Sequence, residues 1–411
     1  MKSKSMKLDY KKTFILGLGF FSASIIWPIY NNYVPIMLES YIKSGTFIGA
    51  IMTIDNIFAV VFQPLFGALS DRTNTRFGRR MPFLLIGVPL AAIFCSLIPW
   101  SNSLFTLMLF IIIMNFSMSI YRAPTVALMP DVTPSPLRSK ANGVINFMGG
   151  FAAVIAYGLG GLLYKVNTGY PFYMASIVMM IALAILYTFI REPENIKVEE
   201  KEKEIKKDVG KNRSLIFMLL AIFFWFTGFN AVETFFSLYG QHILGIEPGT
   251  SSIVLTSFSL AFLVFAIPAG FVAGKLGRKR TILVGIIGAL AVFVPLIFIR
   301  NTLIIPIILV TGGLFWALIN INSYPMIVEM APKGLTGAYT GYYYFFSSTA
   351  AIVSPILFGW IKDLVGSYKP LFVYASMGFV LAFLCMLFVK HGDVKDLDQE
   401  KVEAAELEFG S

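Results

Sequence analysis

The sequence predicts an all-α membrane protein with twelve transmembrane helices in two pseudo-symmetric six-helix bundles. The first reason is composition, because 57% of the 411 residues are hydrophobic and only 14% are charged. A soluble protein carries about 25% charged residues. The second reason is that the apolar residues form twelve long segments, and the third is that related residues recur in the two halves of the chain.

The length and pattern of the apolar segments identify them as helices. A bilayer core is ~30 Å thick and takes about 20 helical residues to cross. Backbone groups in hydrocarbon need internal partners, and the segments lack the alternating pattern of barrel strands. We expect helices near residues 13–38, 46–70, 82–99, 104–130, 140–165, 171–190, 214–240, 252–274, 281–299, 302–330, 336–362 and 370–389.

A polar stretch at residues 191–213 divides these segments into six and six. Its mixed charges and its lack of apolar residues indicate a solvated linker. The predicted organisation is an N-terminal six-helix bundle over residues 1–190, a cytoplasmic linker over 191–213, a C-terminal six-helix bundle over 214–390 and a cytoplasmic tail over 391–411.

The two predicted bundles show signs of duplication. A shift of 198 residues places Trp27 on Trp225 and Asn32 on Asn230. A basic loop that contains glycine also occurs once in each half. Several matches at nearly one offset, in corresponding segments, indicate an internal repeat.

The net charge of +10 is distributed in a way that indicates membrane orientation rather than nucleic-acid binding. Basic residues precede the first segment and fill the loops between segments two and three, four and five, and eight and nine. The alternate loops are nearly free of positive charge. This positive-inside bias predicts a cell-membrane protein with both termini in the cytoplasm.

Motifs for enzymatic chemistry or metal binding are absent from the sequence. It contains no phosphate-binding loop, zinc-binding helix motif or nucleophile elbow. Cys95 and Cys385 lie within segments three and twelve, and His242 and His391 form no metal cluster. We therefore expect no enzymatic activity, no cofactor and no metal site.

The loop after segment two resembles the signature loop of the major facilitator superfamily. That signature reads Gly-x-x-x-Asp-Arg-x-Gly-Arg-Arg, and here it begins at Gly67 and Asp71 with four extra residues before Gly78. The longer form, SDRTNTRFGRRMPF, is similar to that of the sucrose and glycoside cation symporters, and so is the loop over residues 131–142. The resemblance implies two six-helix halves that rock around a central substrate site.

Segment four departs from the plant sucrose carriers at two positions. Those carriers have an arginine just after the proline of helix four, where this chain has Val126. Arg122 lies four residues earlier, about one helical turn away. Asn115 stands where those carriers have an acidic residue. The coupling residues of that group therefore do not carry over unchanged.

Ionisable residues within the segments are candidates for coupling, because a charge at the bilayer centre costs ~3 kcal/mol or more. Asp55 lies about 13 Å deep in segment two at ~1.5 Å per residue, and Arg122 is at a similar depth in segment four. A carboxylate that exchanges an arginine partner for a proton couples transport to protons. A fixed structural ion pair is the alternative. Glu233 in segment seven is a second proton site, a sugar ligand or a helix-end residue.

Charged residues at the cytoplasmic ends of the segments are predicted to stabilise one conformation. Asp71 ends segment two and is followed by a basic loop, so these charges are expected to lock neighbouring helix ends when the cytoplasmic side is closed. Simple signalling of topology is the alternative. The predicted gate residues are Asp71, Arg72, Gly78, Arg79, Arg80, Asp131 and Glu329.

Neutral polar and aromatic residues of segments one, seven, ten and eleven are the candidate ligands. Sugar hydroxyls need donors and acceptors, with an aromatic face for the apolar side of the ring. Aromatic residues also mark membrane interfaces, so not every one is a ligand. The candidates are Tyr30, Asn31, Asn32, Asn230, Glu233, Asn320, Asn322, Tyr324 and Tyr343.

These residues lead to one function hypothesis and two alternatives. The main interpretation is proton-coupled symport of a sugar or glycoside by a monomeric carrier. One alternative is proton-coupled efflux of amphipathic or drug-like compounds, and the other is a non-transporting membrane sensor. The expected partners are a small-molecule solute, the proton and the lipid bilayer, without nucleic acid.

Overall fold

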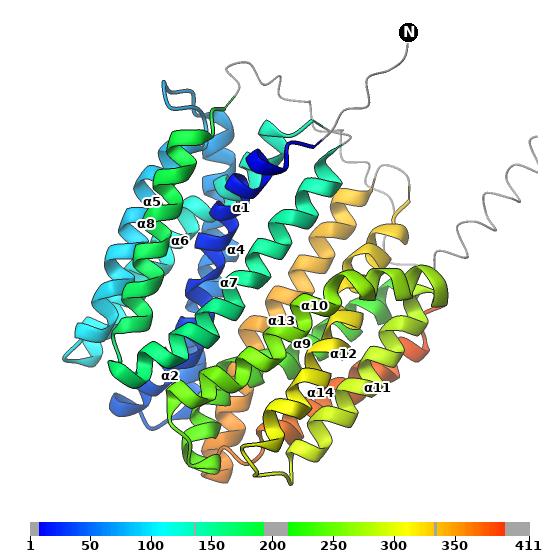
Figure 1. The fold of residues 1–411 in the computed structure, drawn as a ribbon. Coiled ribbons are helices and arrows are strands. Elements are labelled where there is room, and N and C mark those ends of the chain that lie inside the picture. Colours follow the sequence, from blue (N-terminus) through cyan, green and yellow to red (C-terminus); the bar gives the residue numbers. More distant parts are fainter. Residues whose placement is uncertain (1–7, 135–136, 193–212, 333–334, 391–411) are drawn as a thin grey trace, which may run out of the picture. The chain divides into compact units, whose positions relative to one another are not determined.

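The computed structural model describes residues 8–134, 137–192, 213–332 and 335–390, and these residues are almost all helical (Figure 1). The all-helical prediction is therefore confirmed. Most of the predicted linker, at residues 193–212, and the predicted tail, at residues 391–411, lie outside the described residues. The predicted domain boundaries stay predictions.

Twelve helical segments follow in the order that the hydrophobic pattern predicts. Within the described ranges, eleven are long and apolar enough to cross a membrane, and the last is a shorter apolar helix. The short helices η1 (Ile98–Trp100) and η4 (Gly240–Leu244) follow two of them. The segments are α1 with α2 (Tyr10–Ser24 and Ile26–Tyr41), α3 with α4 (Gly45–Met52 and Ile54–Arg72), α5 (Met81–Leu97), α6 (Leu104–Val132), α7 (Arg138–Val166), α8 (Tyr170–Phe189), α9 (Arg213–Tyr239), α10 (Pro248–Leu276), α11 (Arg278–Leu296), α12 (Ile304–Glu329), α13 (Thr336–Val365) and α14 (Leu371–Leu387).

The first two segments are each broken into two helices. Ile25 separates α1 from α2, and Pro28 in the first turn of α2 lacks the N–H that a continuous helix would use. Thr53 separates α3 from α4, with φ −88° and ψ −4°, and its hydroxyl donates to the Ala50 carbonyl oxygen at 2.8 Å. This second break places Asp55 in the first turn of α4.

The helices form two compact units, and the first comprises residues 1–199 and 240–256. In this unit α1 packs on α7 and α8, α5 packs on α6 and α8, and α4 packs on α6. Gly87 of α5 lies against α6, where an added Cβ would come within 2.8 Å of the Tyr121 Cβ and 3.0 Å of the Ser117 carbonyl oxygen. Small residues at such crossings let membrane helices approach closely.

The second unit comprises residues 200–239 and 257–411. Here α9 packs on α13 and α14, and α11 packs on α12 and α14. Gly285 of α11 stands 198 residues after Gly87, and a Cβ there would lie 3.0 Å from the Phe315 carbonyl oxygen and 2.7 Å from the Ile319 Cγ1. The same close crossing therefore occurs in both units, as a duplicated sequence predicts.

The first turns of α10 pack within the first unit. Asn32 Nδ2 in α2 donates to the Pro248 carbonyl oxygen at 3.2 Å. Ser252 Oγ donates to the Tyr157 carbonyl oxygen of α7 at 2.8 Å. Both bonds use the backbone as acceptor, so they depend on close helix contact. Position in the sequence alone therefore does not assign every residue to its packing unit.

Candidate functional site

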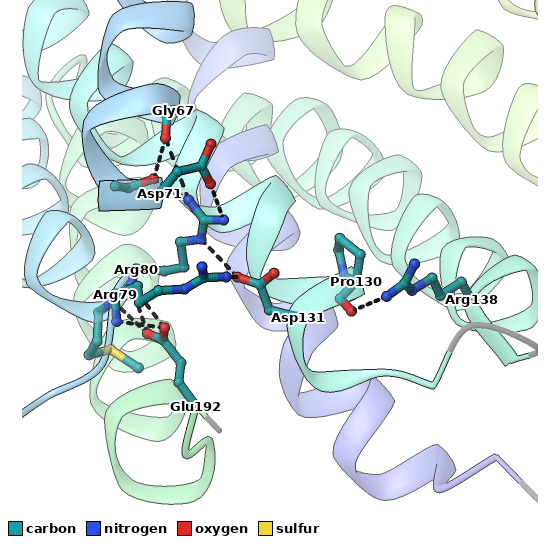
Figure 2. A network of polar contacts seen from close by, with 10 residues as sticks. Gly67, Asp71, Arg79, Arg80, Pro130, Asp131, Arg138 and Glu192 are labelled. Carbon is teal, nitrogen blue, oxygen red and sulfur yellow. Dashed lines mark hydrogen bonds and ion pairs between the residues drawn. The ribbon is translucent and has the colours of Figure 1, made fainter. Parts of the chain in front are cut away.

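The loop between α4 and α5 holds a dense network of charged side chains (Figure 2). Asp131 near the end of α6 accepts hydrogen bonds from Arg80 Nε at 2.8 Å and from Arg79 Nη2 at 3.1 Å. Arg80 also pairs with Asp71 at 2.5 Å and donates to the Ser70 hydroxyl. One loop therefore ties the end of α4 to the end of α6.

Arg80 is the centre of this network and is only 4% exposed. Burial of the guanidinium disfavours its charge, but its hydrogen bonds to Asp131 and Asp71 outweigh that effect and raise the pKa of Arg80. The side chain is therefore a permanent buried cation. Removing one partner of a buried ion pair is strongly destabilising, so Asp131, whose side chain is 12% exposed, is essential to this arrangement, whereas the Asp71 side chain is 56% exposed.

Glu192, just after α8, caps the start of α5. Its carboxylate accepts hydrogen bonds from the backbone N–H groups of Arg79 at 2.7 Å, Arg80 at 2.9 Å and Met81 at 2.8 Å. These N–H groups have no acceptor within the helix, and a negative charge is stabilised at a helix N-terminus. Sequence analysis assigned this residue to the linker and missed it. Its position directly after an apolar segment is the signal that was available.

Gly78 has two reasons to lack a side chain. Its φ is +103°, a region that other residues rarely adopt. An added Cβ would also lie 2.6 Å from the Glu192 Oε1. The predicted gate residues Asp71, Arg79, Arg80 and Asp131 thus lie together (Figure 2), and Gly78 lies beside Glu192, whereas Arg72 is exposed. Their role in gating is a proposal.

A simpler contact follows α10 in the second unit. Arg278 Nη2 lies 2.5 Å from Glu329 Oε1 and joins the start of α11 to the end of α12. Lys279 Nζ donates to the Val389 carbonyl oxygen, just after α14, at 2.5 Å. Glu329 therefore holds a helix end, which is the kind of position that the gate prediction requires.

A polar cluster within the spanning part of the first unit includes the predicted proton carrier. Tyr30 in α2 is 1% exposed, and Asn115 Nδ2 in α6 donates to its hydroxyl oxygen at 3.4 Å. Asp55 lies within electrostatic range of Tyr30. Asn56 Nδ2 donates to Asp55 Oδ1 at 2.8 Å. The carboxylate therefore belongs to a set of polar groups from three helices.

Arg122 joins the same cluster through Trp27. Its guanidinium carbon lies 5.4 Å from the centre of the Trp27 ring, within cation–π range. That ring meets the Tyr30 ring edge-on, with the centres 6.0 Å apart. A carboxylate and a guanidinium in one cluster can exchange partners when a proton neutralises the carboxylate. The geometry is therefore compatible with the proton-coupling role predicted for Asp55 and Arg122.

An aromatic cluster with few polar groups lies on α9 and α12 of the second unit. Trp316 stacks on Phe229 with ring centres 4.1 Å apart and meets Phe226 edge-on at 5.6 Å. Glu233 and Asn230 of α9 are half-buried, and Asn230 Nδ2 donates to the Phe226 carbonyl oxygen at 2.8 Å. Apolar rings beside a few polar groups are the composition of a small-molecule site.

Two of the predicted ligands hold helices together. Asn32 is 1% exposed and donates to Pro248, as described above. Asn322 is 3% exposed, and its Nδ2 donates to the Leu318 carbonyl oxygen at 2.9 Å and to the Ala269 carbonyl oxygen at 3.3 Å. The second of these bonds joins α12 to α10. These contacts account for the amide nitrogens of both residues, whereas Asn32 Oδ1 has no hydrogen-bond partner among the described residues.

The remaining predicted ligands divide by exposure. Asn31 and Asn320 are half-buried. Tyr343 is buried, and its hydroxyl lies 3.4 Å from Ser323 Oγ. Tyr324 is 36% exposed, and its ring lies 5.3 Å from that of Tyr343. Tyr324 therefore presents a more accessible aromatic surface than Tyr343.

The family model described as Major Facilitator Superfamily matches residues 15–355 and 241–409. The chain belongs to the Major Facilitator Superfamily. This facilitator is a multi-pass membrane protein and a secondary transporter rather than an enzyme. The predicted major facilitator fold is confirmed.

Relatives of this facilitator include named drug-resistance proteins. Multidrug resistance protein 2 of Bacillus subtilis (strain 168) is 26% identical over 399 residues, which cover 91% of this chain and 93% of the relative. Tetracycline resistance protein, class H, of Pasteurella multocida is 25% identical over 280 residues, 66% of each chain. Both names refer to drug resistance, not to sugar transport.

A solved structure supports the same fold. A mutant of the nucleoside transporter NupG superposes with a TM-score of 0.72 at 14% identity, over 92% of this chain and 100% of that chain. Identity at this level indicates shared architecture and carries no information about the cargo of this facilitator.

Proposed function

We propose that this transporter exports an amphipathic, drug-like compound in exchange for protons. The similarity to a multidrug resistance protein over 91% of the chain is the observation that carries the proposal. In this proposal the protein acts as a monomer in the plasma membrane, with both termini in the cytoplasm, as the distribution of basic residues predicts.

The aromatic cluster of α9 and α12 supports an amphipathic cargo. Trp316 is buried and stacks on the half-buried Phe229, and Glu233 on the same helix as Phe229 offers a negative charge. Aromatic faces bind both planar apolar groups and organic cations, and a carboxylate strengthens the binding of a cation. We therefore propose that Glu233 contacts the cargo or carries a second proton.

The cluster around Tyr30 supports coupling to protons. A proton that binds Asp55 removes a negative charge near Tyr30 and leaves the positive charge of Arg122 against Trp27. A change of charge in a weakly polar environment shifts the balance between conformations. In export, protons move inward through this step while the cargo moves outward.

Symport of a sugar or glycoside is the second candidate, and the longer loop after α4 favours it. The extra residues form a turn that is closed by a hydrogen bond from the Gly78 N–H to the Thr75 carbonyl oxygen at 2.9 Å. This turn leads directly into the gate network at Arg79. The similarity to named drug-resistance proteins favours export over symport.

Vesicles reconstituted with the purified protein distinguish the two candidates. An acidic interior should drive uptake of exported compounds, such as tetracycline or tetraphenylphosphonium, through molecules whose cytoplasmic side faces outward. An acidic exterior should drive uptake of a symported disaccharide such as sucrose. Accumulation of sucrose alone would reject the export proposal and favour the second candidate.

The variant Asp55→Asn tests the coupling step. It mimics the protonated carboxyl, so the ratio of internal to external cargo at steady state should fall at least about tenfold, which is ~1.4 kcal/mol less free energy stored in the cargo gradient. Exchange of internal for external cargo involves no net movement of protons and should fall less than uphill uptake. The matched control is Asp363→Asn on the exposed end of α13. Uphill uptake by Asp55→Asn at the wild-type level would assign the proton to another residue, with Glu233 the next to test.

A further inference from the structure

Two polar atoms of the cluster around Tyr30 have no hydrogen-bond partner among the described residues. They are the indole nitrogen Nε1 of Trp27, a donor, and the amide oxygen Oδ1 of Asn115, an acceptor. Both atoms are buried. In the membrane interior an unsatisfied polar group is costly, so such groups normally have a partner.

The surroundings of these two atoms define a subsite. Both residues flank Tyr30, since the Trp27 ring meets the Tyr30 ring edge-on and Asn115 Nδ2 donates to the Tyr30 hydroxyl. Asn115 and Tyr30 are each 1% exposed. Arg122 covers the face of Trp27 and fixes that ring. The donor and the acceptor are therefore held on side chains whose other contacts are already made.

We propose that this subsite binds a hydroxyl or carboxamide group of the transported compound. Such a group both accepts and donates, so it can pair with the Trp27 Nε1 donor, with the Asn115 Oδ1 acceptor or with both. The inference deepens the proposed export function and rests on it. It makes Trp27 and Asn115 determinants of specificity, whereas Asp55 and Arg122 respond to the proton.

A pair of probes isolates this role. Tetracycline carries hydroxyl and carboxamide groups, whereas tetraphenylphosphonium is a lipophilic cation that has no hydrogen-bonding group. Their binding to the purified full-length protein is measured by calorimetry at one pH. A pocket that recognises hydrogen-bonding groups must treat the two probes differently when it is altered, because buried polar groups left unpaired discriminate strongly between ligands.

Trp27→Phe removes the indole N–H and keeps an aromatic ring for Arg122, and Asn115→Leu removes the amide at similar volume. Each change should weaken tetracycline binding about tenfold or more. Binding of tetraphenylphosphonium should change less than about twofold, which also shows that the variants fold. Asn115→Gln, which keeps donor and acceptor, should restore part of the tetracycline affinity.

Matched controls use the same substitutions elsewhere in the first unit. Trp100→Phe removes an indole N–H that donates to the Tyr173 hydroxyl at an exposed site. Asn146→Leu removes an exposed amide that bonds within α7. Neither control should change the affinity for either probe.

The outcomes separate this inference from the export proposal. Unchanged tetracycline affinity in both variants, or an equal loss for both probes, overturns the inference and leaves export standing. A wild-type protein that binds only tetraphenylphosphonium does the same. A wild-type protein that binds neither probe and takes up sucrose instead removes the export proposal, and the inference with it.

Discussion

The loop after α4 and the loop after α10 share a backbone feature and differ in what surrounds it. Gly78 and Gly277 have φ of +103° and +87°. Each is followed directly by basic residues, which are Arg79 and Arg80 in the first loop and Arg278, Lys279 and Arg280 in the second. The turn that directs these basic residues toward neighbouring helix ends has therefore been kept in both units.

The partners of the basic residues are different in the two loops. Arg80 meets two carboxylates, and Glu192 caps the helix that follows. In the second loop Lys279 meets a backbone carbonyl, and Gly274 stands where the first loop has Asp71, at the same spacing from its preceding glycine. The two loops share the backbone turn at the glycine, but the carboxylates around the basic residues are concentrated in the first loop. We infer that the first loop is the stronger lock.

The largest difference is expected between Asp131→Asn and Glu329→Gln. Asp131→Asn leaves the buried Arg80 with one carboxylate fewer and should cost about 3 kcal/mol, the lower end for a broken buried pair. Glu329→Gln acts on a pair whose side chains are 19% and 20% exposed, so it should cost about 1 kcal/mol. Thermal unfolding in detergent measures both. Equal shifts in Tm would contradict a stronger first lock.

A smaller effect is expected from Gly78→Ala. The positive φ costs about 1–2 kcal/mol for any other residue. Crowding against Glu192 adds to that strain and should loosen the cap on α5. Gly366→Ala is the control, because Gly366 has φ +71° and open space around its Cα. If the two variants lose the same stability, the contact with Glu192 adds nothing to the lock.

Glu192→Gln should have a milder effect of about 1 kcal/mol, because the amide keeps an acceptor and loses the charge at the helix N-terminus. Hydrogen exchange at the amides of Arg79, Arg80 and Met81 should become faster, while amides in the middle of α5 stay protected. Unchanged exchange at these three amides would show that the carboxylate does not hold them in solution.

The smallest effect is expected from Lys279→Met in the second loop. The change removes one hydrogen bond to the Val389 carbonyl oxygen and should cost about 0.5–1 kcal/mol. Initial transport rates should stay within about twofold of wild type, whereas Arg80→Met should slow transport at least tenfold. A strong transport defect in Lys279→Met would give the two loops equal weight and break the comparison.

Hydrophobic pattern was sufficient to predict the helices, because each spanning segment must carry its own apolar surface. It was also sufficient to find Asp71 and Arg80, since charges at segment ends stand out against apolar neighbours. Glu192 was missed because its role depends on the start of α5, which is more than a hundred residues earlier in the chain. A pairing of that kind depends on packing, and the position of Glu192 directly after an apolar segment does not by itself reveal its partner.

The direction of the polar side chains was a second feature that the sequence did not predict. Asn32 and Asn322 were predicted to face a ligand, and both donate to backbone carbonyls of α10. An asparagine in an apolar helix can bind a ligand or join two helices, and its neighbours in sequence do not reveal which. The break at Thr53 was equally invisible, because no proline marks it and a threonine is tolerated in an intact helix.

The length of α4 makes the helix break at Thr53 important for movement. Asp55 lies in the first turn of α4 and Asp71 in its last, sixteen residues or about 24 Å apart at ~1.5 Å per residue. In the proposed mechanism α4 moves as one helix that pivots at Thr53 and is held at Asp71. Protonation of Asp55 acts beside Thr53, and the ion pair between Asp71 and Arg80 holds the other end of α4. Pro64 lies between Asp55 and Asp71 and interrupts the ladder of helical hydrogen bonds. It therefore sets how much of a displacement at one end of α4 is transmitted to the other end.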